Sequence, residues 1–287
     1  MGVVSVFVTI VAGLSVSSLV VVLVITSVLT HRSLYSQPTG NSTLPYTIDF
    51  IFENLSSQQQ DIFHQASIRW RRVLADDLPT IAVLEGTWCG YTFPQPRATS
   101  NLLIWVRIIP IDGQSGVLGR AGPCAVDFYG YPRFGLVELD VADVNPVVLE
   151  HVAAHEIGHV LGLGALWQEG VTYEGSNYLL SGANAAHSGL GGAGPARVET
   201  DGGGGTAGSH WDEQTYETEL MTGFLSSEGP LSTISIAALA DLGYQVRLEE
   251  ADAYELPSGR RLTESTPFNC TQIAPEAKIV HTAIKLF

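Results

Sequence analysis

Basic residues are scarce in this sequence. The 287 residues include 14 lysines and arginines against 29 aspartates and glutamates, a formal net charge of −15 at pH 7. Nucleic acids and anionic lipid surfaces would repel so acidic a chain. Because 45% of the residues are hydrophobic, the chain can still bury a substantial core. The composition therefore predicts an acidic globular protein that does not bind nucleic acid, and we expect it to be monomeric.

Charge is absent from the start of the chain. Residues 2–30 contain no charged side chain and consist mainly of Val, Leu, Ile, Ser and Thr. At about 1.5 Å per residue, this run is long enough to cross a bilayer core. It lacks the positive start and the small-residue cleavage site of an ordinary signal peptide. Two interpretations stay open for residues 1–30, a cleaved signal peptide or an uncleaved membrane anchor.

Three glycosylation acceptor sequences bear on the compartment. They begin at Asn41, Asn54 and Asn269, and they matter only if the chain enters a glycosylating lumen. The lone Arg32 behind the apolar run would favour a cytoplasmic domain by the positive-inside rule. We give more weight to the three acceptor sites. The expectation is a secreted or membrane-anchored protein whose folded domain is extracellular or lumenal.

Cysteine is rare as well. Cys89, Cys124 and Cys270 permit one disulfide and one remaining thiol in an oxidising compartment. The sequence alone does not choose the pair.

The N-terminal half of the domain alternates strands and a helix. An alternating pattern predicts a strand at 46–52, and Ser57 with Gln60 predicts a capping box at the start of an amphipathic helix. Two further strands are expected at 102–111 and 134–141, separated by a glycine-rich turn region from Gly113 to Gly122. This order indicates an α+β fold with a twisted mixed sheet and a backing helix.

Glycine and proline mark the elements that follow. Pro146 suits the first turn of a helix over 146–163, and Gly162 and Gly164 mark its end. The segment 169–209 is dense in glycine and serine and is predicted to be a loop. Its GLGGAG run follows no strand and opens no helix, so a dinucleotide site is not expected. A last helix is predicted over 232–242.

One five-residue pattern carries the strongest chemical signal. His155, Glu156 and His159 form H-E-x-x-H inside the predicted helix. Residues four apart share a helix face, so both imidazoles can reach one ion. Zinc held by neutral imidazoles lowers the pKa of a bound water toward 7, and Glu156 can serve as its general base. Gly162 extends the pattern to H-E-x-x-H-x-x-G, which weakens the alternative of a chance match.

The third ligand is missing from its usual place. Metzincins usually supply a histidine three residues after that glycine, but this position is Ala165. The chain here resembles the leishmanolysin-like metalloproteases, a metzincin family in which a long insertion precedes the third histidine. By that resemblance His210 is the third ligand, and Met221 is the Met-turn residue beneath the metal. The resemblance runs from about residue 46 to residue 246 and is most specific at 209–211 (SHW), 219–223 (ELMTG) and 231–244.

Other histidines are weaker candidates. His151 shares a helix face with His155 and His159, but residues 151 and 159 would lie about 12 Å apart along the axis, too far for one tetrahedral ion. His151 is expected to be a surface residue or to support the ligands. His187, in the glycine-rich insertion, stays open as an alternative third ligand. The remaining histidines have no metal context: His31, His64 and His281.

We expect five segments along the chain. Residues 1–30 are the signal peptide or anchor, 31–45 a polar stalk, and 46–163 an upper catalytic subdomain that carries the zinc helix. Residues 164–248 form an irregular lower catalytic subdomain with the insertion, the third ligand and the Met-turn. Residues 249–287 form a polar tail, expected to pack loosely.

The expected function is that of a metalloendopeptidase with one catalytic Zn²⁺ and protein or peptide substrates. The resemblance implies that substrate binds extended between the two subdomains and adds a strand to the sheet edge. One alternative is a non-catalytic, zinc-stabilised adhesion or binding module at the cell surface. Glu156 argues against it, because a structural zinc would use a fourth protein ligand. A zinc hydrolase that acts on something other than peptides also stays open.

The mode of activation is not evident from the sequence. The stalk contains no cysteine that could cap the metal, so no ordinary cysteine switch is expected. Cys89 or Cys124 could take that role, but a structural disulfide is favoured.

Overall fold

The computed structural model describes most of the chain beyond the stalk. All described residues belong to one compact unit, Asn41–Phe287. The apolar segment, the stalk and the acceptor Asn41 lie outside the described residues. Described are residues 46–257 except 76–77, 84, 115, 204, 225 and 227–228, and the short segments 269–272 and 278–279.

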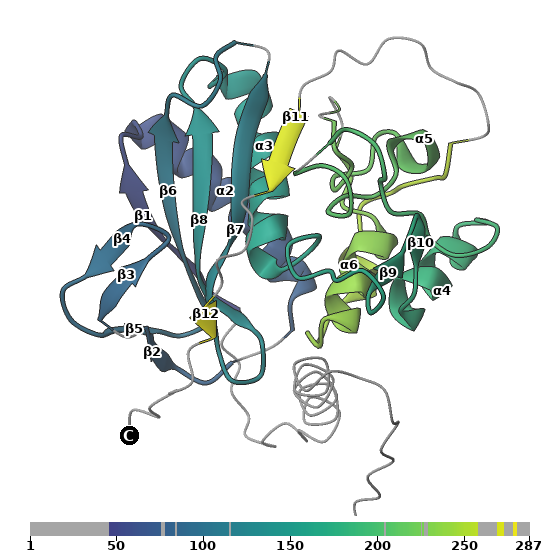
Figure 1. Ribbon diagram of the computed structural model, residues 1–287, viewed down its shortest axis with the longest axis horizontal. Coiled ribbons are helices and arrows are strands. Elements are labelled where there is room, and N and C mark those ends of the chain that lie inside the picture. Colours follow the sequence, from purple (N-terminus) through teal and green to yellow (C-terminus); the bar gives the residue numbers. More distant parts are fainter. Residues whose placement is uncertain are drawn as a thin grey trace, which may run out of the picture. The chain divides into compact units, whose positions relative to one another are not determined.

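A six-stranded mixed sheet forms the frame of the fold (Figure 1). β1, β6 and β8 are parallel to one another, β7 runs antiparallel to β8, and β11 and β12 pair with β7 in parallel. The mixed sheet and the α+β class agree with the prediction. The strands are β1 (Ile48–Glu53), β6 (Leu102–Ile109), β8 (Pro132–Asp140), β7 (Val117–Val126), β11 (Asn269–Gln272) and β12 (Lys278–Ile279).

Both faces of the sheet are covered. On β6, Ile104 and Val106 belong to the main core, whereas Leu103 and Trp105 belong to a second cluster on the opposite face. Successive strand residues point to opposite faces, so a strand buried on both sides reads as a continuous apolar run. The segment LLIWVRII therefore needs no polar alternation to be a strand.

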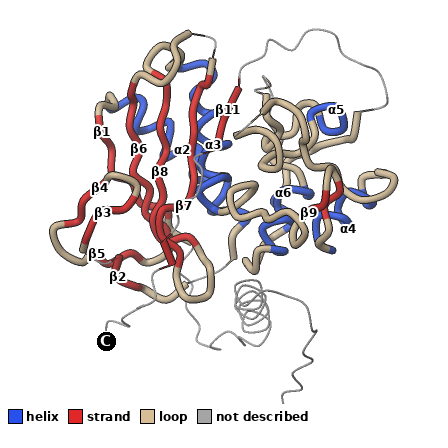
Figure 2. The backbone as a smooth tube through the Cα atoms, in the orientation of Figure 1, coloured by secondary structure: helices blue, strands red, loops and turns tan. Residues whose placement is uncertain are grey.

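Two helices cover the main-core face: α2 (Ser57–Val73) and α3 (Pro146–Leu161) (Figure 2). The capping box of α2 joins Ser56 to Gln59, one residue earlier than predicted at each position. The close fit of α3 to the sheet depends on Gly135 of β8. A β-carbon there would come within 2.3 Å of Val160 Cγ1. Glycine at this position therefore lets the helix approach the sheet.

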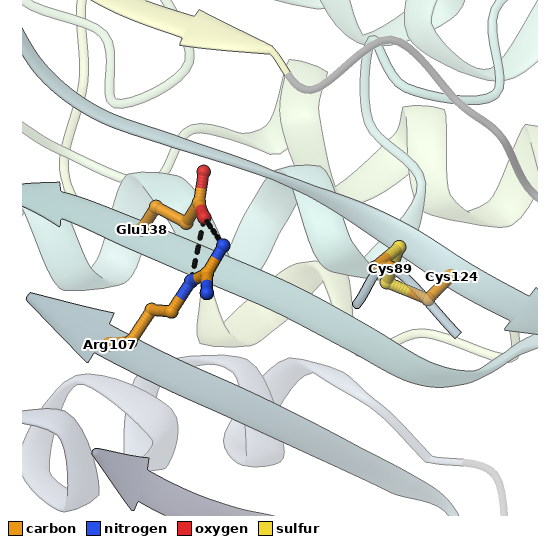
Figure 3. Close-up of a disulfide and its surroundings, with 4 residues drawn as sticks. All are labelled: Cys89, Arg107, Cys124 and Glu138. Carbon is orange, nitrogen blue, oxygen red and sulfur yellow. Dashed lines mark hydrogen bonds and ion pairs between the residues drawn. A yellow bond between two sulfur atoms is a disulfide. The ribbon is translucent and has the colours of Figure 1, made fainter. Parts of the chain in front are cut away.

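Two small antiparallel pairs contribute to the rest of the upper region. Cys89, next to β3, forms a disulfide with Cys124 of β7, with 5.7 Å between the Cα atoms (Figure 3). The pairing that the sequence left open is thus settled, and Cys270 is the remaining cysteine. The pairs are β2 (Ile81–Val83) with β5 (Arg97–Thr99), and β3 (Gly86–Trp88) with β4 (Tyr91–Phe93).

The region after the zinc helix contains more structure than predicted. Helix α4 lies inside the segment 169–209 that was expected to be a loop. Its first N–H groups, those of Gly182 and Ala183, donate to the carboxylate of Asp241, a residue distant in sequence. Local sequence could not reveal this cap. The elements are β9 (Tyr173–Glu174), β10 (Asn177–Tyr178), α4 (Ser181–Gly189), α5 (Glu213–Tyr216), α6 (Thr233–Asp241) and the 3₁₀ turn η1 (Leu248–Glu250).

The prediction of a loosely packed tail was wrong for two segments, because β11 and β12 extend the main sheet. Among the described residues, no helix is both long enough and apolar enough to cross a membrane.

Candidate metal centre

Two of the predicted ligands lie one turn apart on α3. The Nε2 atoms of His155 and His159 are 2.9 Å apart, and both side chains are buried. The spacing of four residues places them on one face, as the motif predicts.

His210 reaches the same point from a distant loop. Its Nε2 lies 3.2 Å from that of His155 and 3.0 Å from that of His159. The turn after α3 makes this approach possible, because Gly164 adopts a φ of +67° and a β-carbon there would stand 1.8 Å from the carbonyl oxygen of Ser209. Only glycine fits a backbone contact this close.

The three imidazoles are oriented by backbone carbonyl groups. Each Nδ1 lies within hydrogen-bond distance of one carbonyl oxygen, which fixes the proton on Nδ1 and leaves the Nε2 lone pair facing the other two rings. Three such lone pairs repel one another unless a cation lies between them. The oxygens are those of Leu220 at 2.6 Å from His155, Leu163 at 2.8 Å from His159 and Thr206 at 3.0 Å from His210.

The charge state of the three imidazoles and the distances between their Nε2 atoms both fit a zinc ion. Burial lowers the pKa of His155 to about 4 and that of His210 to about 3, and burial also holds the pKa of His159 well below its usual value. All three rings are therefore neutral at pH 7, the form that binds metal. Tetrahedral zinc with Zn–N bonds near 2.0–2.1 Å places its nitrogens about 3.3 Å apart. The cluster of three buried histidines fits such a site.

Glu156 is buried on the same helix, directly after the first ligand. Its carboxylate lies against β7, where a β-carbon on Gly119 would stand 2.7 Å from Oε1. Sequence reasoning missed Gly119, which belongs to the segment expected to be a turn. The sequence shows only that this position is a glycine, and a glycine alone does not reveal that Glu156 packs against it.

Met221 lies beneath the zinc helix. A β-carbon on Gly158, the residue before His159, would come within 2.6 Å of Met221 Sδ and 2.9 Å of Trp70 Cζ2. Trp70 in turn donates its indole N–H to the carbonyl oxygen of Ala154, 2.8 Å away. The carbonyl oxygen of Met221 accepts from Trp211 N–H at 3.0 Å. Met221 thus packs between α3 and the chain that carries His210.

Glu219 is a second residue that sequence reasoning missed. Its buried carboxylate accepts hydrogen bonds from the backbone of Met221 and from the side chains of Ser232 and Ser235. Burial raises the pKa of Glu219, and these hydrogen bonds oppose the rise. Ser232 also caps α6 through the N–H of Ile234.

The competing histidines lie elsewhere. His187 of α4 is buried, and its Nδ1 lies 3.1 Å from the hydroxyl of Tyr216. Neither His187 nor His151 joins the cluster of candidate ligands found among the described residues. His151 lines a small pocket beside His155, together with Leu220 and Phe224.

Fold and site together define a class of protein. A mixed sheet backed by helices carries a cluster that can give zinc three neutral imidazole ligands, with an acidic side chain next to the first ligand in sequence. Three protein ligands that leave a fourth position open are typical of zinc hydrolases, whereas structural zinc sites are closed by four.

Comparison with known proteins narrows this class, and the chain is leishmanolysin-like. The family model described as leishmanolysin matches residues 194–263, which include His210 and Met221. A leishmanolysin homolog of Crithidia fasciculata is 23% identical over 249 residues, 75% of this chain and 37% of that protein. Leishmanolysin of Leishmania donovani is 27% identical over 202 residues, 60% of this chain and 32% of that protein. The matches span about a third of the length of these relatives.

Proposed function

We propose that this protein is a zinc-dependent endopeptidase whose single catalytic ion is held by His155, His159 and His210. The observation that supports it most directly is the convergence of three Nε2 atoms within 3.2 Å of one another, two of them on α3, the helix that also carries Glu156, and the third on His210 of a distant loop. The similarity to leishmanolysins supports the same reading.

In the proposed reaction the protein supplies position and proton transfer. A zinc ion bound to three neutral imidazoles would polarise the peptide carbonyl and lower the pKa of a water molecule toward 7. Glu156 takes a proton from the attacking water and passes it to the leaving nitrogen. Its carboxylate is buried beside Gly119, which keeps bulk water away from it. Met221 supports the zinc helix from below.

We further propose that the substrate is a protein chain bound extended between an upper subdomain, residues 46–163, and a lower subdomain, residues 164–248. Strand β7, which touches Glu156, lies at the side of the sheet opposite β1, where the short strands β11 and β12 pair with it.

Replacement of the general base tests the proposal. Glu156→Gln should keep one zinc per chain and a near-wild-type melting temperature, while peptidase activity falls at least a hundredfold. Glu150→Gln, on an exposed position of the same helix, is the matched control and should leave activity unchanged. Activity of Glu156→Gln within tenfold of the wild type would refute the assignment. A chelator-sensitive assay on a peptide library separates a peptidase from other zinc hydrolases.

The cellular location is a separate proposal. We propose that the domain enters the secretory lumen, because three acceptor sequences follow the apolar segment along the chain. Asn54 is exposed and therefore accessible to a glycan. Expression in a glycosylating cell should give a band that shifts on glycosidase treatment, and Asn54→Gln should remove part of the shift. A chain without any shift would indicate a cytoplasmic orientation.

A further inference from the structure

Glu219 occupies the centre of a buried hydrogen-bond network. Oε2 accepts from the backbone N–H of Met221 at 2.6 Å. Oε1 accepts from the hydroxyl of Ser235 at 2.6 Å, and from the hydroxyl and the backbone N–H of Ser232 at 2.7 and 3.2 Å. Burial of a carboxylate is costly unless several donors compensate it. Here one donor is the N–H of Met221 in the Met-turn, and the other donors belong to Ser232 and Ser235 at the start of α6.

The network leads to two metal ligands by separate routes. The carbonyl oxygen of Leu220, the next residue, lies 2.6 Å from Nδ1 of His155. The hydroxyl of Ser235 also accepts the indole N–H of Trp211 at 2.9 Å, and Trp211 directly follows His210. The same carboxylate thus fixes the backbone that orients the first ligand and the side chain that anchors the third.

We infer that Glu219 is a positioning residue for the metal centre, one that sets the relative placement of His155 and His210. The inference rests on the proposed zinc function. A ligand displaced by a fraction of an ångström binds zinc less well, and loss of an outer partner typically costs ten- to a hundredfold in metal affinity.

Glutamine is the informative substitution because it keeps the size of the side chain. The hydroxyl of Ser232 already accepts from Ile234 N–H, and that of Ser235 accepts from Trp211. Both hydroxyl protons therefore need the carboxylate as acceptor. A glutamine whose NH₂ group replaces Oε1 turns it toward both hydroxyls, and a glutamine whose NH₂ group replaces Oε2 turns it toward the N–H of Met221.

Zinc affinity, measured by chelator competition, tests the inference without relying on catalysis. Glu219→Gln should raise the zinc dissociation constant at least tenfold and alter the visible spectrum of the cobalt-substituted protein. The control is Asp241→Asn, which removes another α6 carboxylate, one that accepts from the N–H groups of Gly182 and Ala183 in α4. It should lower stability and leave zinc affinity within twofold.

An unchanged zinc affinity in folded Glu219→Gln would overturn the inference, whatever its melting temperature. If that variant does not fold, Ser235→Ala replaces it, because it leaves the carboxylate in place and removes the link to Trp211. It should weaken zinc binding at least threefold, and an unchanged affinity would again overturn the inference. A wild type that binds zinc without cleaving peptides would refute the proposed function alone.

A second inference concerns the outer edge of β7. Strand β11 lies beside β7 (Figure 1) and pairs with it in parallel. Cys270 lies opposite Gly119, and Thr271 lies opposite Arg120. Strand β11 also lies beside α3. Gly119 of β7 is the residue that contacts Glu156. Residues 269–272 of the same chain therefore pair with β7 at the point where β7 passes the proposed general base.

We propose that this edge binds extended peptide segments and that residues 269–272 occupy it in the free protein as an internal competitor. An extended peptide that adds to a sheet edge does so through main-chain hydrogen bonds, which require no particular sequence. A substrate aligned along β7 at Gly119 needs the same main-chain groups, so it must displace β11. This proposal also rests on the proposed function.

Proline scanning of β11 tests it in the full-length chain. Proline lacks an N–H, and of two neighbouring strand residues one donates toward β7. One of Cys270→Pro and Thr271→Pro should therefore raise kcat/KM on a peptide at least fivefold. Asn269→Gln is the control, since it removes the same glycosylation site without removing an N–H. It should leave kcat/KM unchanged.

A binding measurement makes the test independent of catalysis. A fluorescent peptide with the sequence of residues 265–276 should bind the proline variant in which β11 has lost its hydrogen bond to β7. It should not bind the wild type. Failure to bind either protein, or unchanged kcat/KM in both proline variants, would overturn the proposal. If neither the wild type nor the variants cleave peptides, the proposed function is refuted. Binding of the fluorescent peptide then still tests whether the edge of β7 accepts an extended segment.

Discussion

Gly119 and Glu156 are in direct contact, so close that a β-carbon on the glycine would stand 2.7 Å from the carboxylate oxygen Oε1. The contact joins the β7 edge of the sheet to the proposed general base. The nearest atom that a new methyl group would meet is the end of a flexible side chain, which can turn away at small cost, whereas Leu139 Cδ2 and the carbonyl oxygen of Glu138 would stand at 3.1 and 3.3 Å. A substitution at Gly119 should therefore displace the base more than it destabilises the fold.

Gly119→Ala should lower kcat at least tenfold with zinc content unchanged. Gly135→Ala is the comparison, because its β-carbon would strike Val160 on the zinc helix and not Glu156. That variant should lose about 1–3 kcal/mol of stability through overpacking. Steady-state kinetics and thermal unfolding of both proteins separate the two effects. Equal losses of activity in both variants at equal zinc content would contradict a specific role for the contact.

Gly158→Ala should destabilise the protein despite the higher helix propensity of alanine. The added methyl would come within 2.6 Å of Met221 Sδ and 2.9 Å of Trp70, both tightly packed. Overpacking typically costs about 1–3 kcal/mol, more than the gain of about 1 kcal/mol from replacing a helical glycine. Gly189→Ala, in α4 with open space around it, should be neutral or stabilising. A stability of Gly158→Ala at or above the wild type would show that the Met-turn packs more loosely than described.

The histidine cluster of the candidate metal centre was predictable from sequence where the ligand chemistry and the helical period coincide. The spacing of His155 and His159 implies one helix face, and family resemblance supplied His210 and Met221, which the structure brings to the same place. Strand β7 was not predictable, because its glycines and proline are typical of a turn. Gly119 is required there by its contact with Glu156, a tertiary constraint.

Two further features depend on partners distant in sequence. Helix α4 is capped by Asp241, and Glu219 accepts from serines 13 and 16 residues away, one at the N-cap of α6 and one in its first turn. No periodic pattern connects such residues, so they become visible only when the chain is folded.

Glu213 gives stability a specific pH dependence. Burial raises the pKa of its carboxyl group to about 7, and the nearby carboxylates of Glu199, Glu217 and Asp212 add to the rise. The folded pKa lies above the ordinary value of 4.5, so the folded state holds the proton more tightly. This contribution to stability is complete below about pH 4.5 and is lost as the pH rises through about 7.

Glu213→Gln should therefore raise the melting temperature at pH 8 and change it little at pH 5. Thermal unfolding of wild type and variant in parallel at both pH values measures the difference, and the exposed Glu150→Gln should show none. A variant less stable than the wild type at pH 8 would mean that the ionised carboxylate is stabilised in the folded protein.

The third ligand can be tested by comparing two buried histidines. His210 directs its Nε2 toward those of His155 and His159, whereas His187 lies by Tyr216 in the α4 region. Both variants to alanine should lose stability, His187→Ala by about 1–3 kcal/mol, because each removes a buried hydrogen-bonding ring. The melting temperature alone therefore does not distinguish a ligand from a structural histidine.

Zinc content does distinguish them. Removal of one of three ligands leaves two imidazoles, which bind zinc too weakly to survive dialysis against a mild chelator. We expect His210→Ala to lose both zinc and activity under these conditions, and His187→Ala to retain one zinc per chain when measured below its melting temperature. Metal analysis after dialysis gives the answer directly. A zinc-replete His210→Ala beside a zinc-free His187→Ala would overturn the metal centre proposed here.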